Sequence, residues 1–235
     1  MASPLTPPPH THLHESRIPG LLFANVFTFS FALIIVILRF VSRRLSHLPF
    51  WWDDYLMLPA LVAAAVLFFT DTVYMVNNGL GRHIYVAPDP PTAAVRWAIG
   101  LFVTEISYTL TIVMVKFSVL VMYWRIFRES KTVRIAIYVL GGVVAAWGVA
   151  FLLVTIFDCS PVKGAWTRFS MEAVMNPAMA PVCRVQAEPA YLSNSAINIV
   201  TDIAILILPM YQVWQLNLPR AQKLAVCGIF AIGIL

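Results

Sequence analysis

Two charged residues, Glu105 and Lys116, interrupt an apolar stretch at residues 97–127 that is long enough to cross a bilayer. A charge at membrane depth costs roughly 2.5–3.5 kcal/mol on insertion scales, so each side chain needs a partner, a wet cavity or a function. On a helix the two residues share one face, about 16 Å apart along the axis, which is too far for direct pairing. The pattern indicates either a ladder of buried polar groups with a structural role or a helix with a ligand-sensing or gating role.

A second polar ridge is expected on a helix near residues 190–213, where Asn194, Asn198 and Asp202 recur at intervals of four. Counting from the helix ends places Asp202 and Lys116 at depths within about one turn of each other. A buried ion pair between Lys116 and Asp202 is therefore one hypothesis that the sequence supports. The alternative is that each charge binds backbone carbonyls or water separately.

Two acidic residues, Asp71 and Glu105, are both expected about two turns below the outer surface. If their helices place them in one low-dielectric pocket, their mutual repulsion would favour binding of a proton or a cation from outside. Because sequence does not define which helices are neighbours, separate environments for the two carboxylates remain the alternative.

The composition identifies an integral membrane protein before any motif is considered. Of the 235 residues, 60% are hydrophobic and only 11% are charged, and the mean hydropathy is +0.80. A soluble domain averages about 25% charged residues. The net charge of +5 is then explained by basic residues at helix ends facing the cytoplasm, and nucleic-acid binding is not needed to account for it.

Five segments have the roughly 20 mostly apolar residues that a membrane span requires, at residues 20–41, 54–76, 97–127, 135–157 and 190–213. A sixth begins near Leu224 and reaches Leu235 after only about 18 Å of helix, so we expect a fragment that ends within helix six. The predicted fold is all-α, a polytopic transmembrane helix bundle with about five and a half helices in this chain.

Basic residues predict the orientation of these helices. Short links at the first, third and fifth connections carry most of them: Arg39, Arg43, Arg44, Arg125, Arg128, Lys131, Arg134, Arg220 and Lys223. This density places those links inside and the N-terminus outside, consistent with a multi-pass protein of the plasma membrane. Residues 1–18 are expected to be a disordered extracellular tail rich in Pro and His, and residues 19–235 to be one transmembrane domain.

Cys159 and Cys183 flank a long link on the predicted extracellular side, where disulfides persist, so a bond between them is expected. Cys227 would be a buried thiol in helix six. The chain contains no phosphate-binding glycine loop, no HExxH pair and no nucleophile elbow. The sequence therefore predicts a protein that is not an enzyme and has no cofactor and no metal site.

A set of residues distributed over the chain resembles the fungal rhodopsin-domain family of integral membrane proteins. The resemblance rests on Arg39 and Arg43 with Asp53 and Asp54, on Gly79, Gly81 and His83, on the stretch KFSVLVMYWRIF at residues 116–127, on Cys159, Pro161, Trp166 and Cys183, and on Asn198, Asp202, Pro209, Trp214 and Lys223. It implies a heptahelical, receptor-like (GPCR-like) protein of the pathogenicity-associated type, with an extracellular N-terminus. It does not imply retinal binding, because this sequence does not contain helix seven, where a microbial-type opsin carries its Schiff-base lysine.

We therefore expect a sensor whose outer pocket, under the loop between the two cysteines, binds an unknown extracellular ligand. The exit of helix three at Arg125, Ile126 and Phe127 would couple motion to a cytoplasmic partner, a heterotrimeric G protein by analogy. The alternative is a transporter or proton-linked permease that uses the intramembrane charges as a polar pathway. A transporter of this kind commonly shows internal repeats, and no convincing repeat is present.

Overall fold

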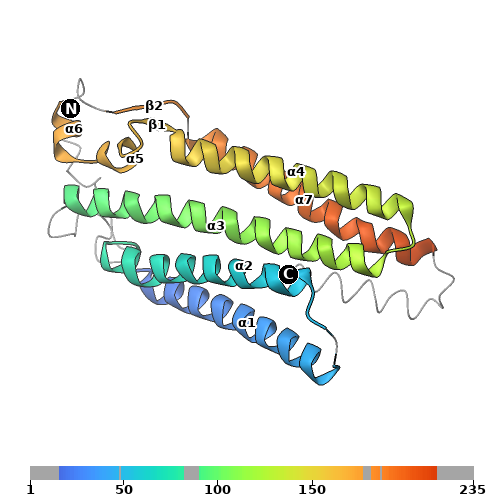
Figure 1. Cartoon of the computed structure of the whole chain (residues 1–235). Coiled ribbons are helices and arrows are strands. Elements are labelled where there is room, and N and C mark those ends of the chain that lie inside the picture. Colours follow the sequence, from blue (N-terminus) through green and yellow to red (C-terminus); the bar gives the residue numbers. More distant parts are fainter. Residues whose placement is uncertain (1–15, 48, 82–89, 177–180, 186, 216–235) are drawn as a thin grey trace.

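The computed structural model describes residues 16–47, 49–81, 90–176, 181–185 and 187–215. In this part of the chain, five long helices lie side by side and the short elements gather at one end (Figure 1). The long elements are α1 (Ile18–Leu45), α2 (Trp52–Phe69) with its π-helical continuation η1 (Thr70–Met75), α3 (Pro90–Ile126), α4 (Lys131–Phe157) and α7 (Ala187–Gln215). The short ones are β1 (Cys159–Ser160), α5 (Gly164–Thr167), α6 (Met171–Met175) and β2 (Val182–Cys183).

Each long helix meets the length and hydropathy that a membrane span requires, over Ile18–Leu45, Trp52–Met75, Thr92–Ile126, Lys131–Phe157 and Pro189–Tyr211. Large apolar side chains cover their outer faces, as the exposed Phe23, Phe27 and Phe31 do along α1. Such surfaces are stable in a lipid environment, where every backbone polar group is bonded within its helix. The predicted all-α transmembrane bundle is confirmed, while the extreme N-terminal tail (residues 1–15) and the sixth helix with Cys227 lie outside the described residues.

Helix α3 occupies the middle of the bundle, where it packs against α2 on one side and α4 on the other (Figure 1). Two glycines allow this approach. A Cβ added at Gly100 would lie 2.6 Å from Met75 Cγ, and one added at Gly148 would lie 2.6 Å from Val113 Cγ2. Small residues let transmembrane helices approach closely, and Gly148 allows this contact of α4 with α3, whereas Gly142 faces open space.

Helix α4 also contacts α7, which completes the central group of helices. At the end of the bundle where α3 meets the start of α4, six buried residues form an apolar core: Leu120, Tyr123, Val133, Ile137, Ile205 and Leu208. We call this end, which also contains Arg39 and Arg43, the arginine end. The core joins side chains from three helices and fixes α3, α4 and α7 relative to one another there.

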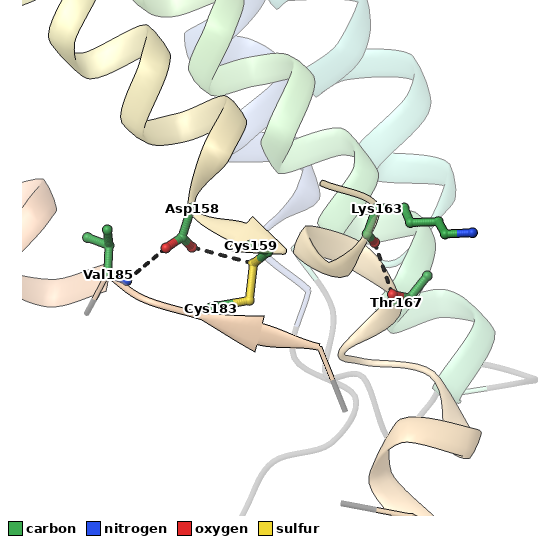
Figure 2. Close-up of a disulfide and its surroundings, with 6 residues drawn as sticks. All are labelled: Asp158, Cys159, Lys163, Thr167, Cys183 and Val185. Carbon is green, nitrogen blue, oxygen red and sulfur yellow. Dashed lines mark hydrogen bonds between the residues drawn. A yellow bond between two sulfur atoms is a disulfide. The ribbon is translucent and has the colours of Figure 1, made fainter. Parts of the chain in front are cut away.

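The opposite end, which we call the disulfide end, contains the strands and the short helices. Strands β1 and β2 pair antiparallel with Cys159 opposite Cys183, and the predicted disulfide joins the two residues (Figure 2). Helix α5 packs closely against the residue before β2. A Cβ added at the first residue of α5, Gly164, would lie only 2.5 Å from Pro181 Cβ, so glycine is needed there. The disulfide, the strand pair and α5 therefore form one small cap, which α5 attaches to α3.

Candidate functional site

A cavity of about 430 Å³ lies beneath this cap at the disulfide end. Its walls come from α3, α4 and α7, and its roof from the cap; the lining residues are Trp97, Ala98, Leu101, Phe102, Glu105, Phe151, Val154, Thr155, Asp158, Ala165, Arg168, Phe169, Val185, Ala190 and Tyr191. Four of these side chains are aromatic rings of Trp or Phe, and only a few are polar. A mostly apolar cavity of several hundred cubic ångströms with a few convergent polar groups is typical of a small-molecule site.

Glu105 is the acidic group on the α3 wall of this cavity. It lies half-buried about four turns into α3, and the Tyr191 hydroxyl of α7 donates a hydrogen bond to its Oε1. This bond connects two helices that are far apart in sequence. A carboxylate on the wall of an apolar cavity is expensive unless it is bonded, so Tyr191 supports its presence there.

Two further charges line the cavity near the cap: Asp158 directly follows α4, and Arg168 directly follows α5. Asp158 Oδ1 accepts a hydrogen bond from the Val185 backbone N at 2.8 Å, which Figure 2 shows beside the disulfide. The backbone oxygen of Asp158 accepts a second bond, from Arg184 N at 3.0 Å. Asp158 therefore holds the return of the chain after β2. Although Asp158 and the two cysteines are close together, the disulfide leaves no thiolate to bind a metal.

Asp71 does not share a pocket with Glu105. Its Oδ1 accepts a hydrogen bond from the Thr104 hydroxyl at 2.8 Å, within the packing of η1 against α3, and Asp71 is not among the residues that line the cavity. Thr104 and Glu105 are consecutive on α3, so their side chains point about 100° apart. The hypothesis of paired carboxylates is therefore replaced by two separate environments on different faces of α3.

Lys116 forms the hypothesised ion pair with Asp202, with Nζ 3.1 Å from Oδ1. The ammonium also donates to Asn198 Oδ1 at 2.5 Å, to the Asn198 backbone oxygen at 3.1 Å and to Thr201 Oγ1 at 2.6 Å. It lies 5.4 Å from the ring centroid of Trp147 on α4. Lys116 is 5% exposed, so this network joins α3, α4 and α7 in the middle of the bundle.

The polar ridge of α7 divides between two roles. Asn198 and Asp202 both bind Lys116, whereas Asn194 does not join them. Asn194 is buried, and its Oδ1 has no hydrogen-bond partner in the part of the chain that the structure describes. Thr201 and Trp147 complete the lysine site and were missed from sequence, because neither residue type is unusual in a membrane helix.

At the arginine end, four charged residues form an ionic cluster whose pairing was not predicted from the sequence. Arg39 and Arg43, one turn apart on α1, bind Asp53 and Asp54 at the start of α2. Arg39 Nη2 and Arg43 Nη2 lie 2.6 and 2.7 Å from Asp53 Oδ2, and Arg39 Nε and Arg43 Nε lie 2.9 and 3.3 Å from the oxygens of Asp54. The two carboxylates are 0% and 1% exposed. The sequence signal that could have predicted this cluster is a pair of adjacent acids close to two arginines that are four residues apart.

This ionic cluster is connected to α3. The Ser118 hydroxyl donates to the backbone oxygen of Asp53 at 2.7 Å, and the rings of Trp51 and Trp124 stack at 5.7 Å. Asp54 also caps the start of α2, because its Oδ2 accepts a hydrogen bond from Trp51 N at 3.2 Å. The end of α3 is thus packed on the first turn of α2.

The three residues predicted to couple to a partner differ in their exposure. The guanidinium of Arg125 lies 5.5 Å from the centroid of the Trp51 ring, and Phe127 packs against the apolar core. Only Ile126 of the three is freely exposed, at 57%. Two of the three residues therefore have packing roles that are sufficient to explain their presence.

These helices and the polar groups between them define a multi-pass membrane protein. The model for the fungal rhodopsin domain matches residues 38–235, which is most of the chain, and the chain belongs to that family. No solved structure matches it.

Named relatives are fungal proteins. A polyenoic acids biosynthesis gene cluster protein of Metarhizium anisopliae is 28% identical over 216 residues, covering 90% of this chain and 55% of the relative. A SAT4 family membrane protein of Emericella nidulans is 25% identical over 196 residues, covering 83% and 45%. The Phomoidride biosynthesis cluster protein H of a fungal strain is 29% identical over 214 residues, covering 80% and 73%. The chain thus spans about half the length of the first two relatives and nearly three quarters of the third.

Proposed function

We propose that this protein is a receptor-like sensor, not an enzyme, and that an extracellular small molecule occupies the cavity at the disulfide end. The observation that carries the proposal is the cavity, which has aromatic walls and a half-buried carboxylate and lies beneath a cross-linked cap. A pre-formed site of this kind is suited to bind a ligand without large rearrangement. Two of the three relatives are named for biosynthesis clusters, and none of the three names specifies a reaction, which is compatible with a sensing role.

In this proposal the disulfide end faces the outside of the plasma membrane and the N-terminus is extracellular. Disulfides persist in oxidising compartments, which favours an outer location for Cys159 and Cys183. Basic residues are concentrated at the opposite end, as expected for a cytoplasmic face. Both features give the same orientation.

Helix α3 is the proposed path from the cavity to the cytoplasm. It carries Glu105 in the cavity wall, Lys116 in the central network and Trp124 on the Trp51 ring. A ligand that shifts α3 would therefore change packing at the arginine end. A heterotrimeric G protein is the proposed partner there by analogy with other heptahelical receptors.

The transporter alternative receives no comparable support. Asp71 and Glu105 point to different partners, and Lys116 is closed off by acceptors from α7. A permease pathway built from these groups together with Asp202 requires them to follow one another along a continuous route. In the described residues they form three separate sites.

The proposal can be tested in cells that express the protein with a tagged G-protein α subunit. Fractions of fungal culture medium serve as the stimulus, and association is read by proximity of the two tags. Ala165→Trp fills the cavity from the cap, and Met175→Trp places the same side chain at an exposed position outside it. We expect an active fraction to change association for the native chain and Met175→Trp, but not for Ala165→Trp.

Two results would overturn the sensor proposal. One is the absence of any ligand-dependent association across the fractions. The other is uptake of a solute into vesicles that Glu105→Ala or Asp202→Ala abolishes, without any association of a partner.

A further inference from the structure

We infer that the cavity at the disulfide end recognises a molecule with an apolar body and a single protonated nitrogen, which Glu105 binds as its counter-ion. This inference rests on the proposed function for the location of the ligand, and it specifies the chemical class of that ligand. Three observations carry it: the hydrogen bonding of Glu105, the balance of charge in the cavity, and the aromatic walls.

The carboxylate of Glu105 has unused capacity for hydrogen bonds. An ionised carboxylate offers about four acceptor sites. Within the described residues Glu105 accepts one side-chain bond, from Tyr191 to Oε1, and its Oε2 receives none. Glu105 also lines the cavity directly. An ammonium, with three N–H donors and one positive charge, satisfies the remaining sites better than a neutral group does.

The other charges in the cavity wall leave Glu105 available. Asp158 is held by the Val185 backbone N. Arg168 forms no ion pair within 4 Å in the part of the chain that the structure describes, and its guanidinium lies 4.9 Å from the ring centroid of Phe169. The lining residues thus carry two carboxylates and one guanidinium, a formal charge of −1. One positive charge on the ligand neutralises the cavity, and Arg168 disfavours a second one.

The walls suit the remainder of such a ligand. Trp97 and Phe102 of α3 and Phe151 of α4 line the cavity together with aliphatic residues. Aromatic rings bury apolar groups efficiently, and their faces attract a neighbouring cation. The site therefore combines a counter-ion with a surface for an apolar body, which selects a cationic amphiphile over an inorganic cation or a free carboxylic acid.

The inference is tested with three probes of one shape on the full chain in lipid nanodiscs: phenethylamine, 2-phenylethanol and 3-phenylpropionate. They present an ammonium, a hydroxyl and a carboxylate on similar arms. Binding is measured by isothermal titration calorimetry at neutral pH. We expect phenethylamine to bind at least about tenfold more tightly than the alcohol. A charge-assisted hydrogen bond is roughly twice as strong as a neutral one, and that difference corresponds to about a tenfold change in Kd. The carboxylate should bind most weakly.

Variants assign the preference to its residue. Glu105→Gln keeps the shape of the side chain and should remove the preference for the amine over the alcohol. Asp71→Asn makes the same chemical change in η1, beside the other face of α3, and should keep that preference in full. Tyr191→Phe removes the internal donor to Glu105, so amine binding should be retained or strengthened.

Several results overturn the inference: no saturable binding of phenethylamine, equal binding of the three probes, or a preference that survives Glu105→Gln. These results are distinguishable from failure of the proposed function. Amine binding that depends on Glu105, without any effect on association with a partner, keeps the ligand class and rejects the sensor. Association that responds to a fraction free of amines keeps the sensor and rejects the ligand class.

Discussion

Replacing Lys116 by Met should destabilise the protein by about 3 kcal/mol, at the lower end of the 3–5 kcal/mol range for removing one partner of a buried ion pair. Met preserves most of the length and apolar volume of the lysine side chain, so the loss is mainly one of charge and hydrogen bonds. The change leaves Asp202 without its cation and leaves Asn198 and Thr201 without their donor.

The geometry explains why the lower end of that range applies. The side chain of Asp202 is 46% exposed and that of Lys116 only 6%. The lysine charge is therefore buried much more deeply than the aspartate charge. Asp202 supplies one contact to the ammonium, whereas Asn198 and Thr201 supply three. Removal of the aspartate charge in Asp202→Asn should therefore cost only about 1 kcal/mol, similar to one ordinary hydrogen bond.

Unfolding in mixed bicelles by titration with a denaturing detergent provides the assay, with helicity followed by circular dichroism. The double variant Lys116→Met with Asp202→Asn should be more stable than the sum of the two single changes predicts, because the pair couples them. Exchange of the two charges should not restore stability, since an aspartate at position 116 would face the oxygens of Asn198 and Thr201. Finding that Asp202→Asn costs as much as Lys116→Met, or that the charge exchange restores stability, would refute this account.

Two further substitutions test other parts of the bundle by the same assay. Gly148→Ala should cost about 1–3 kcal/mol, because the new Cβ would lie 2.6 Å from Val113 Cγ2 and a β-branched side chain has little freedom to move. Gly142→Ala is the control and should be neutral, because a Cβ there meets nothing within 4 Å. Equal effects at both positions would contradict the close approach of α3 and α4. Arg43→Ala should cost about 2–4 kcal/mol, because it removes two contacts to fully buried carboxylates. Arg44→Ala, on the exposed side of the same turn, should change stability by less than about 0.5 kcal/mol. A neutral Arg43→Ala would show that the cluster is unimportant for stability.

The sequence was sufficient to predict the helices because hydropathy and length determine what a membrane span can be. It also supported the ion pair of Lys116 as one hypothesis, since both charges needed a partner at the same depth. The disulfide followed from two cysteines on one predicted side. The start of α3 at Pro90 was placed several residues too late, because its first turns project from the apolar run into the cap and carry no hydropathy signal.

The lateral arrangement of the helices was the information that sequence lacked. Asp71 and Glu105 have similar depths, but depth does not specify which face of α3 each neighbour covers. The sequence therefore left two alternatives open, and the structure supports separate environments for the two carboxylates. The pairing of Tyr191 with Glu105 depends on α7 lying beside α3 at the disulfide end. The π-helical turn Thr70–Met75 was likewise invisible, because a change in hydrogen-bond register leaves the apolar composition unchanged.

The disulfide has a mechanical consequence for the bundle. Cys159 follows the last residue of α4 by two positions, and Cys183 precedes the first residue of α7 by four, so a covalent link joins these two helices at one end. They cannot slide past each other, and any separation must hinge at the cystine and widen toward the arginine end. Lys116 contacts Trp147 on α4 and Asp202 on α7 between these points. Its ammonium therefore links α4 and α7 at a point between the cystine and the arginine end, and separation of the two helices requires that these contacts break.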